Sequence, residues 1–292
     1  MHDQAAILRN KMKDFSNPPE SINTKVIAVA SGKGGVGKSS FTINFALALQ
    51  EKNKKVLIID LDIGMANVDI MLGLSATYSI VDMLEGSMPI HSIISSGPAG
   101  ISFISGGSGL NELFQMDELK KNFFLQQLAM LSGYEYILFD LGAGVTKDSL
   151  QFLMSAHEVF IITTPDPTSV TDAYGLIKYL HHEDKDIPLF LVVNRVRTKK
   201  EGQATANSVS RVCEQFLNKN INYLISIPED DAVWKGVRSQ SPFVLISPRA
   251  ASSVAIFEAV NRFLYGNGNE IKETSLTGFV TKLKSFFYTK GR

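Results

Sequence analysis

Residues 26–40 read VIAVASGKGGVGKSS, and this stretch decides the fold. Its first five residues are apolar and partly β-branched, which predicts a buried strand. The eight residues from Gly32 to Ser39 match the phosphate-loop pattern G-x-x-x-x-G-K-[ST] at every defined position. Residues 41–49, FTINFALAL, are apolar with helical spacing. Strand, glycine loop and helix in this order predict a nucleotide-binding site.

The chemistry of such a loop explains its residue types. Its glycines let backbone N–H groups converge on phosphate oxygens, and the following helix N-terminus favours an anion. We expect Lys38 to reach the β- and γ-phosphates and the Ser39 hydroxyl to ligate Mg²⁺. The predicted nucleotide-binding residues of the loop are Gly32, Lys33, Gly34, Gly35, Val36, Gly37, Lys38, Ser39 and Ser40. The alternative, a glycine-rich turn without a ligand, is disfavoured by the full pattern in its context.

A second lysine, Lys33, directly follows Gly32. With two lysines the loop resembles that of the deviant phosphate-loop ATPases, the MinD/ParA family. The resemblance implies an α/β fold in which a mostly parallel, twisted sheet is flanked by helices. It also implies that Lys33 reaches across a homodimer interface to the partner's ATP, so that ATP holds the dimer together. The alternative for Lys33 is an ordinary solvated lysine.

Composition places the chain among soluble globular proteins. It has 292 residues, 45% hydrophobic and 20% charged, and its formal net charge is zero. Zero net charge gives no global attraction to nucleic acid, so no nucleic-acid partner is expected. The single cysteine, Cys213, excludes an internal disulfide or a cysteine-rich metal site. It falls in an expected helix over residues 208–217, where we expect a buried, reduced thiol. The first residues lack the features of a signal peptide, and no apolar run is long enough to span a membrane. We therefore expect a cytoplasmic protein.

Two further apolar runs, residues 56–60 and 136–140, predict buried strands that end in an acid. Parallel sheets bind ligands beyond the carboxyl ends of their strands, so Asp60, Asp62 and Asp140 are expected beside phosphates, Mg²⁺ and water. Without the phosphate loop, two acids at a strand end would more often cap a helix.

The family resemblance assigns a role to each acid. Asp62 matches the water-positioning catalytic aspartate, which would act together with Lys33 and Lys38. Asp60 matches a group near Mg²⁺, and Asp140 would hold the ion through water, so the implied metal site is Ser39, Asp60 and Asp140. Asp140 and Gly144 form the implied switch II, where the Gly144 amide senses the γ-phosphate. Much of the wider family has proline where Gly142 stands, which suggests a looser switch.

A base-binding site is implied near two later segments. Residues 189–193 predict another buried strand, and Asn194 after it matches the family asparagine that reads the adenine edge. Residues 227–230 resemble the family's base-binding loop. The residues implied to bind the base are Asn194, Arg195, Pro228 and Asp230. Taken alone, an asparagine at a strand end is more often a turn residue.

Two terminal segments flank the predicted ATPase domain, which spans residues 24–265. Residues 1–23 comprise a short helix and a linker, and residues 3–9, DQAAILR, resemble the activator motif of FlhG-type flagellar regulators. The resemblance implies that this motif stimulates the GTPase FlhF through Asp3, Gln4, Leu8 and Arg9, with Gln4 entering the partner's active site. From spacing alone, a frayed terminus or a docked cap is the slightly favoured interpretation, and the resemblance changes that weighting.

Residues 266–292 comprise a linker and a helix with one apolar and one basic face. The apolar residues follow i, i+3, i+4 spacing and are Leu276, Phe279, Val280, Leu283, Phe286 and Phe287. Lys282 and Lys284 contribute to the basic face of the same helix. Such a pattern is typical of a helix that lies on an anionic membrane surface. The alternative is a last helix docked on the core, and both can hold in turn.

The resemblance implies an ATPase, with ATP or ADP and Mg²⁺ as cofactors, that turns over slowly until it dimerises. It further implies control of flagellar number and placement, with FlhF and flagellar C-ring proteins as partners. ATP-bound protein is then expected at the membrane, near the cell poles or flagellar basal bodies. A MinD-type cell-division regulator, a ParA-like DNA partition protein and an ATP-binding scaffold remain alternatives. A nitrogenase-like reductase would need cluster cysteines that this sequence lacks.

Overall fold

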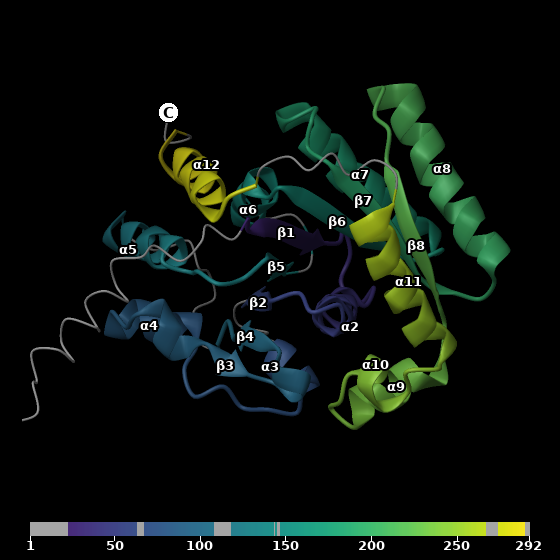
Figure 1. Ribbon diagram of the computed structural model, residues 1–292. Coiled ribbons are helices and arrows are strands. Elements are labelled where there is room, and N and C mark those ends of the chain that lie inside the picture. The colour runs from purple at the N-terminus through teal and green to yellow at the C-terminus, as the bar shows by residue number, and fades with distance from the viewer. Residues whose placement is uncertain are drawn as a thin grey trace, which may run out of the picture.

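The computed structural model describes residues 23–62, 67–107, 118–142, 144, 147–266 and 274–289. Within these residues, eight strands form one sheet in the order β3-β4-β2-β5-β1-β6-β7-β8 (Figure 1). The strands are β1 (Lys25–Ala30), β2 (Val56–Leu61), β3 (Ser95–Ser96), β4 (Ser102–Ile104), β5 (Tyr136–Leu141), β6 (Glu158–Thr163), β7 (Leu189–Val196) and β8 (Asn222–Pro228). Only β3 runs antiparallel to its neighbour among these pairs. The predicted mostly parallel α/β fold is confirmed.

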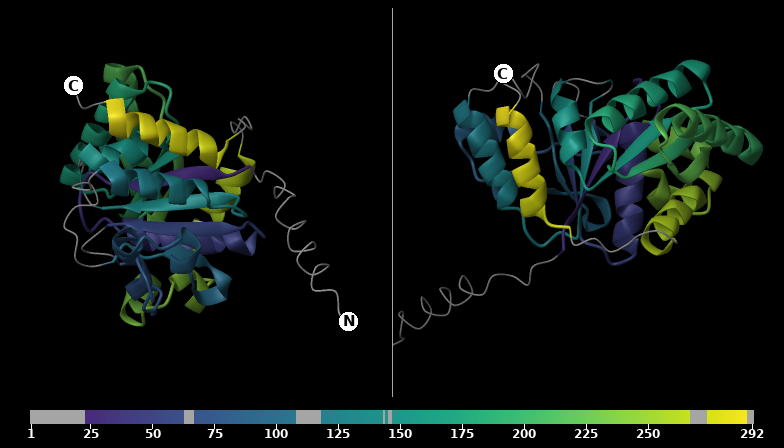
Figure 2. Two further views of the ribbon diagram at one scale, coloured as in Figure 1. Left: turned by 90° about the vertical axis from the view of Figure 1, so that its left-hand side faces the viewer. Right: turned by 90° about the horizontal axis from the view of Figure 1, so that it is seen from above.

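Helices cover both faces of the sheet. They are α2 (Lys38–Glu51), α3 (Val68–Met71), α4 (Ile80–Gly86), α5 (Glu118–Ala129), α6 (Lys147–Ser155), α7 (Pro167–Glu183), α8 (Lys199–Leu217), α9 (Asp231–Arg238), α10 (Phe243–Ile246), α11 (Ala251–Tyr265) and α12 (Leu276–Thr289), with short 3-10 turns η1 (Ile90–Ile93) and η2 (Pro98–Gly100). Helices α4 to α8 and α12 pack on one face, and α2, α3, α10 and α11 on the other (Figure 2).

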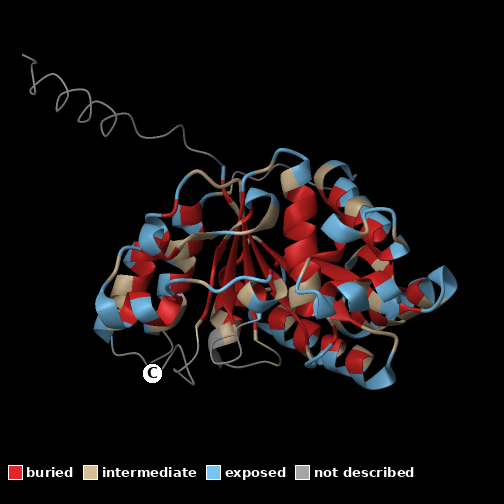
Figure 3. Ribbon diagram, turned by 90° about the horizontal axis from the view of Figure 1, so that it is seen from below, coloured by how far each residue is buried: buried red, intermediate tan, exposed pale blue. Residues whose placement is uncertain are grey.

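Strand β1 shows why the core has two halves. Successive side chains of a strand point to opposite faces. Accordingly Val26 and Ala28 pack with the first group of helices, and Ile27 and Val29 with the second. All four are fully buried, and Figure 3 shows the sheet as the buried centre of the molecule.

Helix α2, which follows the phosphate loop, is buried on nearly all sides. Every residue from Phe41 to Leu49 is buried, as expected of a helix that is apolar all round. Its Phe45 ring packs edge-on against Phe160 of β6 at 5.3 Å and Phe263 of α11 at 5.6 Å between centroids. Aromatic pairs in this geometry add to the stability gained from burial. The helix is therefore fixed between sheet and α11, and it fixes the end of the loop.

The structure corrects the expected extent of two elements. Helix α8 begins at Lys199 rather than near Ser208, because the Thr198 hydroxyl caps it by accepting the Glu201 amide at 3.1 Å. The segment expected as a base-binding loop begins inside a strand, since Ile227 and Pro228 end β8. Cys213 of α8 is buried and carries a free thiol, as expected.

Helix α12 is docked on the domain. It packs against α5 and α6, and Leu276, Phe279 and Leu283 are buried. The Phe279 ring stacks on Phe139 of β5 with centroids 5.3 Å apart. Its apolar face therefore fills the core in this structure, which is the alternative that the sequence left open. No helix in the described ranges combines the length and apolar character needed to cross a membrane.

Candidate nucleotide-binding site

The phosphate loop joins β1 to α2 at the carboxyl edge of the sheet. Gly35 and Gly37 have φ angles of 76° and 92°, in the left-handed region that favours glycine. Gly32 lies so close to α7 that a Cβ placed there would meet the Asp172 backbone carbon at 2.4 Å. The glycines therefore allow both the turn and the close packing of the loop.

Asn194, at the end of β7, holds the loop from the other side. Its Nδ2 donates to the Val36 carbonyl at 2.7 Å, and its Oδ1 accepts the Arg195 amide at 2.9 Å. A Cβ on Gly37 would lie 2.3 Å from the same Nδ2. The sequence predicts Asn194 as a base-binding residue, and the structure places it against the backbone of the phosphate loop. Arg195 is exposed and has a φ of 56°.

Lys38 and Asp140 form a buried ion pair beneath the loop. Lys38 Nζ donates to Asp140 Oδ1 at 2.9 Å, and both side chains are almost fully buried. The Thr42 hydroxyl lies 3.1 Å from the same Oδ1, while Asp140 Oδ2 is buried and has no hydrogen-bond partner among the described residues. Sequence reasoning missed Thr42, although it lies one helical turn after Lys38 and so shares its face.

Asp60 lies next to Asp140, because the two are register partners on β2 and β5. Its Oδ1 accepts the Asp62 amide at 2.9 Å, and its Oδ2 accepts the amides of Asn67 at 2.9 Å and Val68 at 3.1 Å. Asp60 therefore holds the residues on either side of positions 63–66, and both of its carboxylate oxygens accept backbone amides. Burial raises the pKa of Asp60 to about 7, the Asp140 carboxylate pushes it the same way, and the three amides oppose the rise.

Asp62 follows β2 and is only partly buried. Desolvation raises the pKa of Asp62, the nearby Lys38 ammonium opposes this rise, and Asp140 adds to it. The three acids that the sequence singled out, Asp60, Asp62 and Asp140, thus lie together beside Lys38. Such a cluster of interacting charges is common at functional sites.

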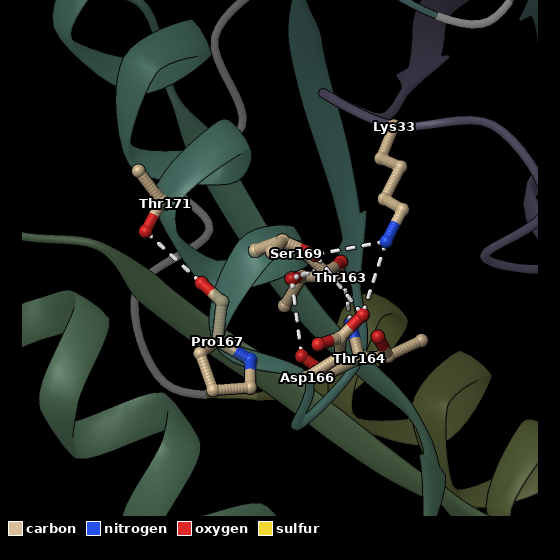
Figure 4. A network of polar contacts seen from close by, with 8 residues as sticks. Lys33, Thr163, Thr164, Asp166, Pro167, Ser169 and Thr171 are labelled. Atoms are coloured by element: carbon tan, nitrogen blue, oxygen red, sulfur yellow. Dashed lines mark hydrogen bonds and ion pairs between the residues drawn. The ribbon is translucent and has the colours of Figure 1, made fainter.

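The Lys33 side chain is bonded to residues at the start of α7 in the same chain. Its Nζ donates to Asp166 Oδ2 at 3.0 Å and to Thr168 Oγ1 at 2.8 Å, and Figure 4 shows the side chain extending toward the start of α7. Hydrogen bonds from Lys33 and Thr168 lower the pKa of Asp166. Neither Asp166 nor Thr168 was predicted to contact the loop.

The remaining predicted site residues fall into three groups. Ser39 and Ser40 lie in the first turn of α2, and Gly144 has a φ of 83°. Asp230 caps α9 by accepting the Ala232 amide at 2.9 Å and also accepts the Ser252 amide at 3.0 Å, while Pro228 ends β8. Asp3, Gln4, Leu8 and Arg9 lie outside the described residues.

Comparisons with known proteins agree with this geometry. A ParA family model, described as NUBPL iron-transfer P-loop NTPase, matches residues 23–264. The antiactivator FleN of Pseudomonas aeruginosa is 32% identical over 237 residues, or 81% of this chain and 84% of that protein. The flagellum site-determining protein YlxH of Helicobacter pylori is 34% identical over 297 residues, or 98% of this chain and 99% of that protein. A chain of the MinC:MinD cell division protein complex of Aquifex aeolicus has a TM-score of 0.68 at 27% identity, with 86% of this chain and 100% of that chain covered.

The parallel sheet and its glycine loop define the class of P-loop NTPases. The chain belongs to the ParA/MinD family of this class, and within it to the FlhG/YlxH group.

Proposed function

We propose that this chain is an ATPase that alternates between a monomer and an ATP-bound, membrane-attached dimer and controls the number and placement of flagella. The observation that carries the enzymatic part is the charged cluster beneath the phosphate loop, in which the buried pair Lys38 and Asp140 lies beside the partly buried Asp62. The flagellar part is supported by the relatives FleN and YlxH.

The donor set fits a nucleotide with Mg²⁺. Asp140 Oδ2 is a buried oxygen without a described partner, and carboxylate and hydroxyl oxygens are the ligands that Mg²⁺ prefers. Ser39 and Asp140 would hold the ion, which would neutralise charge on the phosphates. Lys38 and Asp140 now neutralise each other, so Lys38 needs an anion and Asp140 a cation when they separate. Phosphate and Mg²⁺ supply these two charges.

Asp60 takes a different part from the one implied by resemblance. Since its oxygens accept the amides of Asp62, Asn67 and Val68, we propose that Asp60 positions the segment after β2 rather than ligating the metal. Asp62, two residues further along the chain, orients the attacking water. Catalysis in such sites comes mainly from positioning and charge.

Asn194 and the end of β8 are proposed to hold the base. Asn194 contacts the phosphate loop through its hydrogen bond to the Val36 carbonyl. Arg195, Pro228 and Asp230 lie at or just after the ends of the adjacent strands β7 and β8. Asp230 contributes by capping α9 and bonding Ser252, which fixes this edge of the site.

Dimerisation, membrane binding and partner binding complete the proposal. Lys33 leaves Asp166 and Thr168 to reach the partner's ATP, and α12 leaves the core to lie on an anionic membrane. Two such helices in one dimer bind more strongly than one through avidity. Residues 1–23 stimulate the GTPase FlhF, residues 24–265 form the ATPase domain, and residues 266–292 carry the membrane helix, while C-ring proteins are further partners.

A phosphate-release assay tests the enzymatic part. The wild-type chain with Mg-ATP should release phosphate faster when vesicles of anionic lipid are present, and Asp62→Ala should abolish this while still binding ATP. A chain that binds ATP but never releases phosphate would be a scaffold, which would contradict the proposal.

The flagellar part has its own assay. Wild-type protein should stimulate GTP hydrolysis by purified FlhF, and Gln4→Ala should lose the stimulation. An equal effect of both proteins would contradict the role assigned to the N-terminal segment, and would leave the ATPase assignment intact.

A further inference from the structure

Helix α9 presents an apolar surface to solvent. The side chains of Trp234 and Val237 are 69% and 50% exposed, and they lie three positions apart, so they share one side of the helix. Ala232 and Gly236 on the other side are buried, and a Cβ on Gly236 would meet the Ser241 carbonyl at 2.8 Å. The inner side of α9 is therefore tightly packed, while its outer side exposes the single tryptophan of the chain.

An exposed tryptophan beside basic side chains is typical of a protein-binding surface. Tryptophan and arginine are enriched in protein interfaces and supply much of the binding energy there. Lys235 and Arg238 are exposed next to Trp234. The surface formed by Trp234, Lys235, Val237 and Arg238, here called the α9 surface, therefore suits a partner surface that carries an acid.

The α9 surface borders the nucleotide site. Helix α9 begins directly after Asp230, one of the residues proposed to hold the base. On its other flank, Val237 lines a groove together with Ser40 of α2 and Met71 of α3, and Figure 1 shows α3 and α9 below α2. A molecule that covers the open side of the nucleotide site is therefore placed against the α9 surface.

The second copy in the proposed dimer is such a molecule, and Lys33 indicates which of its helices comes near. Lys33 Nζ contacts Asp166 and Thr168 at the start of α7, and Gly32 packs against the Asp172 backbone. The loop and the first turns of α7 therefore form one continuous surface. Because a lysine side chain is short, a Lys33 that reaches the ATP of the other copy brings the start of α7 close to the α9 surface of that copy.

The start of α7 complements the α9 surface in charge and in shape. Residues 167–174 contain Asp172 and no basic residue. Asp172 shares one side of the helix with three small exposed residues, Thr168, Thr171 and Gly175. Small side chains leave room for a large aromatic ring from the other copy, and the Asp172 carboxylate attracts its basic side chains.

We propose that, in the ATP-bound dimer, the α9 surface of each copy packs against the start of α7 of the other copy. The inference rests on the proposed function, because it names the surfaces that close the proposed dimer around the nucleotide. A two-fold axis makes this contact twice. Both Trp234 side chains therefore leave water when the dimer forms.

Fluorescence of Trp234 tests the inference directly. In the Asp62→Ala protein, which is expected to stay dimeric, Mg-ATP should shift the emission to shorter wavelength and reduce its quenching by acrylamide. Lys33→Ala, which is expected to stay monomeric, is the control for nucleotide binding alone and should show neither change.

Two outcomes would overturn the inference and leave the proposed dimer intact. One is an unchanged Trp234 emission in an Asp62→Ala protein that sedimentation shows to be dimeric. The other is an equal shift in Lys33→Ala protein that remains monomeric. Failure of Asp62→Ala to dimerise would instead contradict the proposed function, and this inference with it.

A charge exchange tests the assignment to α7. Arg238→Asp and Asp172→Arg should each raise the concentration at which half of the Asp62→Ala protein is dimeric by roughly tenfold. Both side chains are exposed, so Tm should not change. The two substitutions together should recover most of the loss, and a double variant that dimerises no better than the single variants would overturn the inference.

Arg211→Asp is the matched control for the charge exchange. Arg211 is also exposed, but it lies in the second half of α8, which runs back from the end of β7 toward the start of β8 and so away from the nucleotide edge. Its substitution should leave the midpoint of dimerisation unchanged. A tenfold loss in this variant too would show a general effect of charge and would overturn the inference.

Discussion

At the scale of single residues, the groups around Asp140 decide how the site is held together. Lys38 and Asp140 can be recognised as site residues from the sequence, because Lys38 belongs to the phosphate-loop pattern and Asp140 ends an apolar strand. Thr42 does not, since its value depends on where Asp140 lies after folding, 98 positions further along. The buried hydroxyl gives Asp140 Oδ1 a second donor next to Lys38.

Removing that hydroxyl should weaken the core of the site. Thr42→Val keeps the side-chain shape but removes the hydroxyl that donates to Asp140 Oδ1 and to the Lys38 carbonyl, so the free energy of unfolding should fall by about 1–2 kcal/mol. Thr42→Ser keeps the hydroxyl and should retain more of the stability. Urea titration of the three proteins measures this, and a valine variant as stable as the wild type would contradict the role of the hydroxyl.

Asp60 makes stability depend on pH. Its pKa in the folded protein is about 7, above the ordinary value of 3.8, so the folded chain binds this proton more tightly than the unfolded chain does. The stability that Asp60 contributes is therefore full below about pH 4 and is lost as the pH rises through about 7. Asp60→Asn cannot titrate, so the stability of the wild type relative to this variant should fall as the pH rises from about 4 to about 7. Denaturant unfolding at several pH values measures this. A free energy of unfolding that changes with pH equally in both proteins would contradict the raised pKa of Asp60.

At the scale of elements, the start of α7 controls Lys33. The ion pair between Lys33 and Asp166 is exposed, and exposed pairs are weak, so releasing Lys33 is easy. Asp166→Asn should therefore allow ATP-dependent dimers at a protein concentration about two- to fivefold lower than the wild type needs. Light scattering across a dilution series measures the midpoint. In a Lys33→Ala background, which is expected to stay monomeric, the substitution should not restore the dimer. A midpoint shifted upward in the single Asp166→Asn variant would show that Asp166 supports the dimer instead.

The apolar face of helix α12 cannot by itself distinguish a membrane-binding helix from a core helix. Leu276, Phe279 and Leu283 have the same spacing whether they face a membrane or a protein core, so the sequence predicts both. The structure places them in the core. Basic residues on the helix distinguish the two uses, because Lys282 contacts Asp184 at 3.1 Å whereas Lys284 is exposed.

Two substitutions separate docking from membrane binding. Phe279→Ala removes a fully buried ring, which typically costs about 3–5 kcal/mol, so it should increase hydrogen exchange in α12. Lys284→Glu should leave exchange unchanged but weaken ATP-dependent binding to anionic vesicles by roughly tenfold. Vesicle binding that is insensitive to Lys284→Glu would argue that α12 is only a core helix.

At the scale of the whole molecule, the sequence predicts the mostly parallel α/β fold and the central strands of its sheet. Buried parallel strands are continuous apolar runs, which is why residues 26–30, 136–140 and 189–193 were recognisable and why the acids after them fall on one edge. The contacts of Lys33 with Asp166 and of Asn194 with Val36 were not predictable. Each joins segments more than a hundred residues apart in the chain, and no local spacing encodes them.

The most direct test of the proposed ATP-dependent dimer is sedimentation velocity of the full chain with Mg-ATP. Wild-type protein should show a mixture of monomer and dimer, Asp62→Ala should remain a dimer because it cannot hydrolyse the ATP that joins the subunits, and Lys33→Ala should remain a monomer. An Asp62→Ala protein that stays monomeric at saturating Mg-ATP, or a Lys33→Ala protein that dimerises like the wild type, would contradict the proposal.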